Sequence, residues 1–396
     1  MDIQRIAEFE AAMGRRIAAL PARLRPFTTE HAALPRALLL TGARGVGKTT
    51  FLLHHAKDRK MLYISAENPL LAGESLYDVV KSIFLAGYEG IVVDEIHYVR
   101  DWSIHAKAIY DDFPEHSLWI SDSSSLVLRT SIADLSRRFL SIRMPLLSFR
   151  EFLYLEKGEL YPVLDPFLQG KSIPLRPTPD LLGEFRAYRA LGTRPFYAEG
   201  NVEDRLLATL DKTLYADIPF FLPSVTNGNL RLMKAITATL AASKIPRLQV
   251  SSLCADWGIG AAKLYQILEV MESVGVLRII RIENDHKARS IGAKLFFSDP
   301  AMYTVLKGDP GTAREALVAA CCAEAGWSVE ACKDEMAGDF VLSRTRSGFD
   351  EGASQRYRIE VGGAKKQRKQ ADFVIRDDID FPGTNALPLW TLGMMY

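Results

Sequence analysis

Short apolar runs alternate with helical patterns through the first third of the chain. Such continuous runs are typical of parallel strands that helices cover on both faces. Residues 73–87 place apolar side chains at helical spacing, and residues 3–17 do the same in an amphipathic pattern. The pattern therefore predicts an α/β domain with a parallel sheet over residues 1–155. The runs are ALLL at 37–40, MLYI at 61–64, GIVV at 90–93, LWI at 118–120 and FLSI at 139–142.

The first apolar run leads into a glycine-rich loop. Gly42, Gly47, Lys48 and Thr49 have the spacing G-x-x-x-x-G-K-[ST] of a phosphate-binding loop. Glycines let backbone N–H groups surround a polyphosphate, and the N-terminus of the next helix adds partial positive charge. We expect Lys48 to reach the β- and γ-phosphates, and the Thr49 hydroxyl to hold Mg²⁺. The predicted nucleotide-binding residues are Gly42, Ala43, Arg44, Gly45, Val46, Gly47, Lys48, Thr49 and Thr50.

Two carboxylates end the apolar run at 90–93. Asp94 is expected to orient the Mg²⁺ shell, because phosphate-loop enzymes place an acid at the carboxyl end of an adjacent strand. Glu95 is placed to polarise the attacking water as a general base. No N-K-x-D motif, which would read a guanine base, follows in the sequence. The pair therefore predicts ATP rather than GTP, and hydrolysis as well as binding.

Polar residues also follow the run at 118–120 and precede the run at 139–142. A side chain in the serine-rich stretch 121–125 could hydrogen-bond the water or the γ-phosphate. The alternative is a turn that caps the next helix. Arg137 and Arg138 come later, and an arginine near a γ-phosphate stabilises the charge of the transition state. The alternative there is an ordinary surface arginine.

Six stretches between residues 42 and 153 follow a specific order: GARGVGKTT, LYISAEN, IVVDEIHYVRDW, LWISDSSS, LSRRF and MPLLSFREFL. In this order the chain resembles a family of prokaryotic AAA+-type ATPases that carry a C-terminal domain of uncharacterised function. The resemblance covers most of the chain. It implies that Ser123 is a polar sensor and Arg138 a loop arginine, acting within one subunit or across an interface. The chain departs from the family at Asp122 and Arg137, where the family has glycine. The expected catalytic residues are Glu95, Lys48, Ser123 and Arg138.

Residues 156–300 contain helical patterns after a proline-rich stretch at 158–182. The resemblance implies that helices within 156–245, among them 203–216 and 229–243, form a lid. Residues 246–300 show a winged-helix pattern of two helices followed by two strands. One interpretation is binding of double-stranded DNA, and the alternative is a winged helix that only packs against protein. The expected DNA contacts are Lys263, Tyr265 and Gln266 on the second helix and Lys287 and Arg289 on the wing.

Residues 301–396 resemble a restriction-endonuclease-like core. A helix with Glu315 precedes two strands that carry Asp339 and Glu360, and such an Asp and Glu hold Mg²⁺ in nucleases. The lysine that would follow Glu360 by two residues is missing, although Lys365 or Lys366 could replace it from a shifted position. Because this group is missing, we expect a degenerate site and no nuclease activity. The basic run at 365–369 is either a solvated helix face or a contact to phosphate.

Composition narrows these interpretations. A net charge of +1 over 396 residues provides no general attraction to nucleic acid, so any such contact needs a local patch. The four cysteines form no C-x-x-C pair, which argues against a zinc site and fits a reducing compartment. The charged N-terminus is unlike a signal peptide, and no apolar run reaches the ~18 residues of a membrane span. We expect a cytoplasmic protein with no membrane contact.

The sequence thus predicts an α/β protein with four parts. They are a P-loop NTPase (AAA+-like) domain at 1–155, a linker and helical lid at 156–245, a winged helix at 246–300, and a degenerate nuclease-like α/β domain at 301–396. The expected activity is Mg²⁺-dependent ATP hydrolysis that drives a conformational change, coupled to DNA or to a protein partner. Two alternatives are a nucleotide-gated scaffold with negligible turnover and an ATP-regulated nuclease. The sequence does not decide between a monomer and a homo-oligomer.

Overall fold

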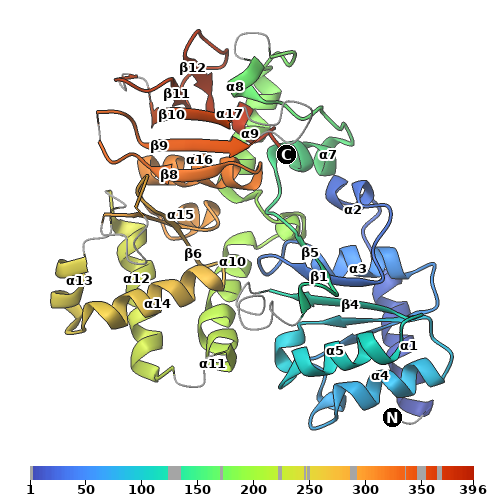
Figure 1. Cartoon of the computed structure of the whole chain (residues 1–396). Helices are drawn as coiled ribbons and strands as arrows, with labels where there is room; N and C mark the ends of the chain where they lie inside the picture. The colour runs from blue at the N-terminus through green and yellow to red at the C-terminus, as the bar shows by residue number, and fades with distance from the viewer. Residues whose placement is uncertain are drawn as a thin grey trace. The chain divides into compact units, whose positions relative to one another are not determined.

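In a computed structural model the chain folds into two compact units (Figure 1). The structure describes residues 3–123, 135–169, 173–221, 225–244, 247, 250–285, 292–334, 336–345, 354–363 and 368–396. Unit 1 consists of Met1–Pro145 and Ala216–Ser224, and unit 2 consists of Leu146–Tyr215 and Val225–Tyr396. Unit 1 is therefore completed by a segment that the chain reaches only after Leu146–Tyr215 of unit 2.

The sheet of unit 1 has five parallel strands in the order β2-β3-β4-β1-β5. This confirms the predicted parallel α/β sheet. Because β4 lies between β1 and β3, the carboxyl ends of these three strands meet at one edge. The strands are β1 (Ala37–Thr41), β2 (Met61–Ser65), β3 (Gly90–Asp94), β4 (Ser117–Asp122) and β5 (Leu140–Arg143). The helices and short turns are α1 (Ile3–Ala18), α2 (Pro26–Glu30), α3 (Lys48–Ala56), η1 (Pro69–Leu71), α4 (Leu76–Leu85), η2 (Ile96–Tyr98), α5 (Trp102–Asp112) and α11 (Ile218–Phe221).

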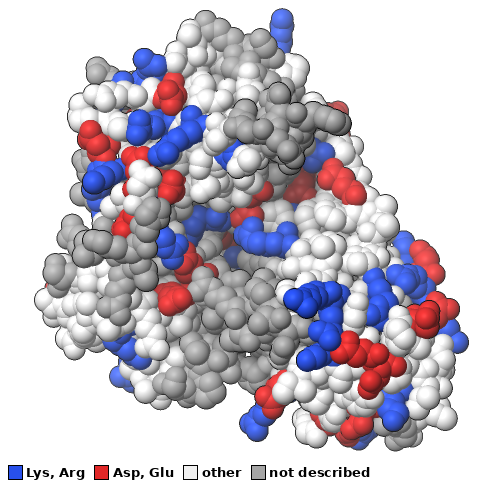
Figure 2. All heavy atoms as spheres, viewed as in Figure 1, with Lys and Arg blue, Asp and Glu red and all other residues white. Residues whose placement is uncertain are grey.

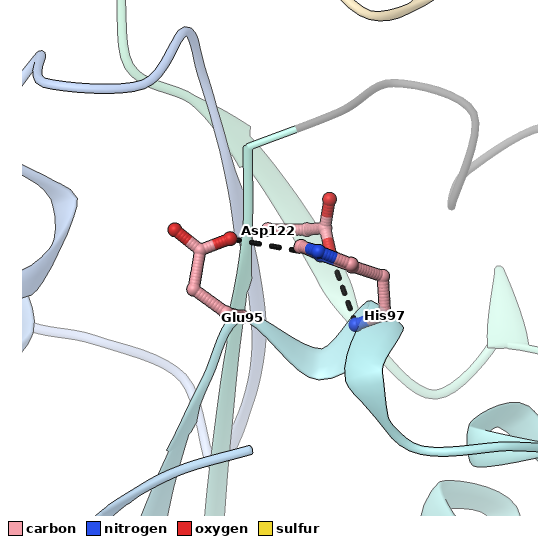
Figure 3. Close-up of side chains that lie close together, drawn as sticks. All are labelled: Glu95, His97 and Asp122. Carbon is pink, nitrogen blue, oxygen red and sulfur yellow. Dashed lines mark hydrogen bonds and ion pairs between the residues drawn. The ribbon is translucent and has the colours of Figure 1, made fainter. Parts of the chain in front are cut away.

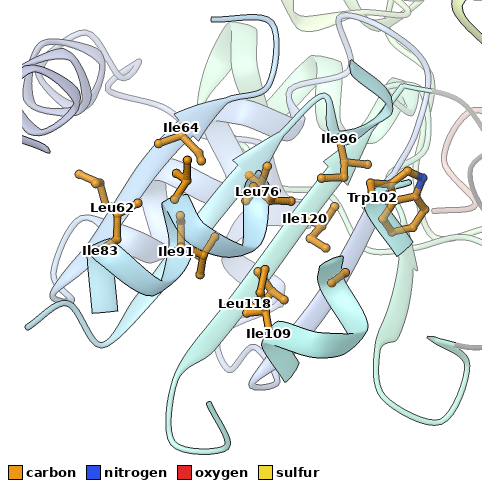
Figure 4. Close-up of a cluster of buried hydrophobic side chains, with 14 of the residues drawn as sticks. Leu62, Ile64, Leu76, Ile83, Ile91, Ile96, Trp102, Ile109, Leu118 and Ile120 are labelled. Carbon is orange, nitrogen blue, oxygen red and sulfur yellow. The ribbon is translucent and has the colours of Figure 1, made fainter. Parts of the chain in front are cut away.

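One face of this sheet packs against α4 and α5 (Figure 4). Alternate strand residues, such as Leu118 and Ile120, point into this cluster with Ile83 and Trp102 from the helices. The intervening residue Trp119 is also buried, so both faces of the sheet are covered, as the continuous apolar runs predicted. Burial of each large aliphatic side chain contributes about 2 kcal/mol. The strand ends that carry the polar residues are therefore held on a well-packed sheet.

Unit 2 contains helices, a two-stranded pair and a second five-stranded sheet. The order is β12-β11-β10-β9-β8, with β9 antiparallel to both neighbours and β10, β11 and β12 mutually parallel. Its strands are β6 (Leu277–Ile280), β7 (Lys294–Phe297), β8 (Ser328–Ala331), β9 (Phe340–Thr345), β10 (Ser354–Gly362), β11 (Phe373–Arg376) and β12 (Ala386–Pro388). Its helices are α7 (Phe149–Lys157), α8 (Pro166–Gln169), α9 (Pro179–Leu191), η4 (Pro195–Glu199), α10 (Val202–Lys212), α12 (Asn227–Ala242), α13 (Val250–Trp257), α14 (Ala261–Ser273), α15 (Ala301–Val305), α16 (Pro310–Glu324) and α17 (Leu389–Leu392).

The helix expected at 203–216 is interrupted. The α-helix α10 ends at Lys212, and the chain widens into a π-helical turn, η5 (Thr213–Asp217), before α11 begins. A π turn shifts the following residues around the helix axis relative to an α-helix, and such turns are frequent at functional sites. The interruption places Asp217 and Ile218 in unit 1, where both are buried.

None of the helices in the described ranges combines the length and the apolar character that a membrane crossing requires.

Candidate functional site

The glycine-rich loop joins β1 to α3 at the carboxyl edge of the unit 1 sheet. Gly42 and Gly47 have φ values of 153° and 104°, a region that favours glycine. A Cβ atom on Gly42 would lie 2.5 Å from the carbonyl oxygen of Met144, so a side chain there has no room. Helix α3 begins directly after the loop, and its N-cap residue Gly47 offers no side-chain acceptor. Its first N–H groups therefore remain available to an anion.

Lys48 folds back over this loop. Its Nζ donates to the carbonyl oxygens of Gly42 at 2.9 Å and Ala43 at 3.3 Å. Burial lowers the pKa of Lys48, and the nearby carboxylates of Glu95 and Asp94 only partly oppose that shift. The ammonium group is thus held at the predicted phosphate-binding loop by two uncharged backbone carbonyl groups.

Asp94 ends β3 beside the start of α3. Its carboxylate accepts hydrogen bonds from the Thr49 hydroxyl at 2.6 Å, from the Tyr63 hydroxyl at 2.8 Å and from the Ser121 hydroxyl. Burial, followed by the charge of Asp94, raises the pKa of Tyr63, so this phenol stays a donor. Thr49 and Asp94 therefore present adjacent oxygen atoms, the kind of ligand that Mg²⁺ prefers. These two residues fit the predicted metal site.

Glu95 follows in a left-handed backbone conformation, with φ 53° and ψ 52°. Residues other than glycine adopt this region rarely, at a cost of order 1 kcal/mol or more. The turn directs the carboxylate to Ser123, whose hydroxyl donates to Oε2 at 3.1 Å. Burial raises the pKa of Glu95, and the positive charges of Lys48 and Arg44 oppose the shift. The structure thus brings the predicted base and the predicted polar sensor together.

His97 and Asp122 complete this edge, and sequence reasoning did not select His97. Asp122 accepts from the backbone N–H of His97 at 3.1 Å and from its Nδ1 at 2.8 Å (Figure 3). The same Nδ1 lies 3.6 Å from Oε2 of Glu95. Burial acts to lower the pKa of His97, but the hydrogen bond and charge of Asp122, together with Glu95, outweigh it and raise that pKa. Asp122, the unexpected carboxylate on β4, is therefore satisfied by His97.

The ligand atoms of Glu95, His97 and Asp122 lie within 4.8 Å of one another, a spacing that metal ligands also show. Here the shortest distance is the 2.8 Å hydrogen bond between the imidazole Nδ1 and Asp122, and Glu95 lies 3.6 Å from the same nitrogen. We therefore assign no second metal to this cluster.

Arg44 links the loop to the late segment of unit 1. Its Nη2 donates to both carboxylate oxygens of Asp217, at 3.0 and 2.9 Å, and its Nη1 lies 3.5 Å from Oε1 of Glu95. Burial acts to lower the pKa of Arg44, and the charges of Glu95 and Asp217 raise it overall. Asp217 was not predicted, because nothing near it in the sequence resembles a nucleotide-site motif.

Arg138, the predicted loop arginine, pairs with Asp111 of α5. Its Nε and Nη2 each donate to that carboxylate at 2.9 Å, and the pair is partly exposed. A role at the γ-phosphate would require the guanidinium to leave Asp111. The other predicted serines of this region, Ser124 and Ser125, lie outside the described residues.

A second group of charged residues lies in unit 2. Lys294 of β7 donates to Glu315 at 2.7 Å and to Asp339 at 3.1 Å. Asp339 also accepts from the backbone N–H of Val361 at 2.8 Å. Glu360 is fully buried, with Lys369 Nζ 3.0 Å from its Oε1. The three predicted acids therefore lie on neighbouring elements, but sequence reasoning missed Lys294; Lys365 and Lys366 fall outside the described residues.

The predicted DNA contacts on α14 are less exposed than expected. Gln266 is exposed, but Lys263 and Tyr265 are half-buried. The Nζ of Lys263 lies 3.4 Å from the side-chain oxygen of Gln266. Lys263 and Tyr265 are therefore less accessible to DNA than the sequence pattern predicted. Lys287 and Arg289 of the expected wing lie outside the part of the chain that the structure describes.

Comparison with known proteins agrees with the site in unit 1. Residues 34–153 match the family model described as AAA domain. The match supports a P-loop ATPase fold of the AAA-domain class for these residues, and such a fold implies nucleotide binding.

The individual proteins that resemble this chain have low sequence identity to it or match only part of its length. An uncharacterized protein of Methanocaldococcus jannaschii is 30% identical over 271 residues, which cover 61% of this chain but only 55% of that protein. Among solved structures, a Walker-type ATPase of Pyrococcus abyssi is 16% identical with a TM-score of 0.44, covering 71% of this chain and 94% of that one. A RuvB variant of Thermotoga maritima is also 16% identical, with a TM-score of 0.34 and coverages of 76% and 95%. With TM-scores below 0.5, both structures show only a distant likeness.

Proposed function

We propose that unit 1 binds ATP with Mg²⁺ and hydrolyses it. The observation that carries this proposal is the convergence of Lys48, the Thr49–Asp94 pair and Glu95 on one edge of the sheet. Each group has a chemistry that phosphoryl transfer to water requires: a cation, a metal site and a base. The match to the AAA domain supports the same class of activity.

In this mechanism the loop N–H groups and Lys48 bind the phosphates. Thr49 and Asp94 would hold Mg²⁺, which neutralises negative charge on the phosphates. Glu95 would take a proton from water, and the hydroxyl of Ser123 would fix its carboxylate in position. Arg138 would add positive charge only after leaving Asp111, from its own subunit or from a neighbouring one.

Turnover and binding must be measured together to test this proposal. Wild-type protein, Lys48→Ala and Glu95→Gln are compared for ATP hydrolysis and for binding of ATP. Asp112→Asn serves as a control, because Asp112 is an exposed acid of α5 that bonds Tyr77. We expect Glu95→Gln to retain binding while its turnover falls at least ~100-fold, the usual contribution of a general base. If wild type hydrolyses ATP no faster than Glu95→Gln, the nucleotide-gated scaffold replaces the enzyme.

We further propose that the helices of 156–245 act as a lid and that 246–300 is a winged helix. The order α13, α14, β6, β7 supports this interpretation, since two helices precede an antiparallel strand pair. DNA is the proposed partner, and packing against protein is the alternative. Figure 2 shows basic and acidic side chains interspersed on the visible face, so only local contacts are expected. Binding to duplex DNA that weakens steeply between low and moderate salt would support DNA. The absence of such binding would favour the protein partner.

For residues 301–396 we propose a nuclease-like fold without cleavage. Lys294 supports this, because its ammonium group already pairs with Asp339, one of the two acids expected to hold a metal, as well as with Glu315. Incubation of plasmid DNA with Mg²⁺ or Mn²⁺ is expected to leave it intact for wild type and Asp339→Ala alike. Metal-dependent cleavage by wild type that Asp339→Ala abolishes would establish the ATP-regulated nuclease instead.

A further inference from the structure

The pair of Arg44 and Asp217 is not explained by a phosphate loop alone. Arg44 is part of the loop that would surround the phosphates, yet its guanidinium is held by a carboxylate 173 residues later in the chain. The Asp217 side chain is 3% exposed and that of Arg44 is 17% exposed, so water screens this ion pair only weakly. Asp217 belongs to unit 1 only through the segment Ala216–Ser224.

That segment is fixed in unit 1 by more than one contact. Ile218, the residue after Asp217, is fully buried, and α11 packs against η2. The Nε2 atom of His97 in η2 lies 3.9 Å from Oδ1 of Asp217. Asp217 therefore faces two elements of the site, the phosphate loop and the turn that follows Glu95.

The charges around Arg44 favour an exchange of partners when nucleotide arrives. Carboxylates and phosphates both accept paired hydrogen bonds from a guanidinium, so the two groups compete for the same arginine. The γ-phosphate of ATP carries more charge than a carboxylate and would enter beside Glu95, which is 3.5 Å from Arg44. Acids outnumber bases in this site: the acids are Glu67, Asp94, Glu95, Asp122 and Asp217, and the bases are Arg44, Lys48 and, when protonated, His97.

We propose that Asp217 is a positioning residue that holds Arg44 as a latch, and that the γ-phosphate of ATP releases this latch by taking Arg44. This inference rests on the proposed binding of ATP in unit 1. When the guanidinium turns to the phosphate, Glu95 loses a neighbouring cation and Asp217 loses its partner. Residues 216–221 are then held less firmly in unit 1. Because this segment connects α10 to α12, its release transmits the presence of the γ-phosphate to the helices on either side.

The latch predicts a specific preference among nucleotides. Asp217→Asn removes the competing charge, so ATP no longer has to displace a carboxylate from Arg44. In a Glu95→Gln background, which prevents turnover, we expect Asp217→Asn to tighten ATP binding about tenfold and to leave ADP binding nearly unchanged. Asp217→Glu restores the acid and is expected to restore most of the wild-type ratio of ATP to ADP affinity. Asp112→Asn, which also removes one negative charge from unit 1, is expected to leave that ratio unchanged.

A double-mutant cycle tests whether the effect passes through Arg44. In Arg44→Gln the ATP preference is expected to fall, and adding Asp217→Asn to Arg44→Gln should then change nothing further. If Asp217→Asn tightens ATP binding equally with and without Arg44, the latch is wrong and Asp217 acts only through its general charge. If Asp217→Asn leaves the ATP to ADP ratio of folded protein unchanged, the latch is equally excluded.

Hydrogen exchange provides a test on the wild-type chain, where no variant needs to fold. Peptides covering residues 213–221 are expected to exchange faster with a non-hydrolysable ATP analogue and Mg²⁺ than with ADP and Mg²⁺. Equal exchange in the two states would overturn the latch while leaving ATP binding intact. Failure of wild type to bind either nucleotide would instead refute the proposed function itself.

Discussion

Lys48 in unit 1 and Lys294 in unit 2 are both buried lysines close to carboxylates, with 5% and 6% of their surface exposed. They differ in what they bond. The Nζ of Lys48 donates to two backbone carbonyl oxygens of the loop, whereas the Nζ of Lys294 donates directly to Glu315 and Asp339. Burial therefore lowers the pKa of Lys48. For Lys294 the same effect of burial is outweighed by the two acids, and the pKa is raised.

The difference teaches how a buried cation is kept ready for a ligand. A lysine bonded to neutral carbonyls has no opposite charge in direct contact, so an incoming phosphate improves its surroundings. A lysine bonded to two carboxylates is already neutralised, so a phosphate or a metal would first have to break an ion pair. On this ground unit 1 is the place to look for ligand binding, and the acids of unit 2 are stabilised without a ligand.

The largest expected effect is on nucleotide binding. Lys48→Ala should weaken ATP binding about 100-fold, because a hydrogen bond to a charged group is worth up to about 3 kcal/mol. Lys294→Ala should leave ATP binding of the folded protein unchanged. Titration calorimetry with both variants measures the contrast. Equal losses would mean that the two lysines do not differ as their bonds suggest.

The next largest effect is on stability, and here we expect the loss at Lys294 and not at Lys48. Lys294→Met leaves Glu315 and Asp339 without their cation, and removal of one partner from a buried ion pair costs about 3 kcal/mol. Lys48→Met removes a charge that burial disfavours and should be neutral or slightly stabilising. Urea unfolding followed separately for the two units measures both. As a control, Asp339→Asn added to Lys294→Met should recover part of the loss.

The pH dependence of unit 2 should follow from the same ion pairs. The pKa of Lys294 in the folded state lies above its ordinary value of 10.5, so the folded form binds this proton more tightly than the unfolded form. The stability advantage of wild type over Lys294→Met is therefore complete below about pH 10 and is lost as pH rises through the folded pKa. Unfolding of both proteins across this range measures the difference. An advantage that instead disappeared between pH 7 and 9 would contradict the pairing.

The smallest effect is expected at Arg138. Its pair with Asp111 is partly exposed, and exposed ion pairs contribute less than about 1 kcal/mol. Arg138→Ala should therefore change the unfolding free energy little and leave ATP affinity intact. Turnover is the informative readout. A loss of turnover that grows with protein concentration would place this arginine at an interface between subunits, and unchanged turnover would remove it from the catalytic residues.

The features that could be predicted from the sequence are those that depend only on neighbouring residues in the chain. The glycine spacing, the apolar strands and the Asp94–Glu95 pair are each contained in a few consecutive positions, and strand order then brings their ends together. The parallel sheet is confirmed. The roles of the site residues stay predictions, although the contacts between Thr49 and Asp94 and between Ser123 and Glu95 agree with them.

Contacts between distant segments could not be predicted in this way. Asp217 meets Arg44 across 173 residues, and Lys294 meets Asp339 across 45. Neither Asp217 nor Lys294 belongs to a motif that predicts its partner. His97 did leave a signal. Asp122 stands where glycine was expected, and a buried aspartate on a strand needs a hydrogen-bond donor. A search for that donor among the residues after the neighbouring strand would have reached His97.

Ala216–Ser224 belongs to unit 1 but comes more than 70 residues after the rest of it in the sequence, and this has a consequence for synthesis of the chain. Ribosomes make proteins from the N-terminus, and domains generally begin to fold as they emerge. Residues 1–145 leave the ribosome well before Asp217 is made, so for a time the phosphate loop exists without its acidic partner. If the latch is correct, ATP binds this nascent sheet more tightly than the finished unit. The nucleotide would then act first as a folding ligand and only afterwards as a substrate.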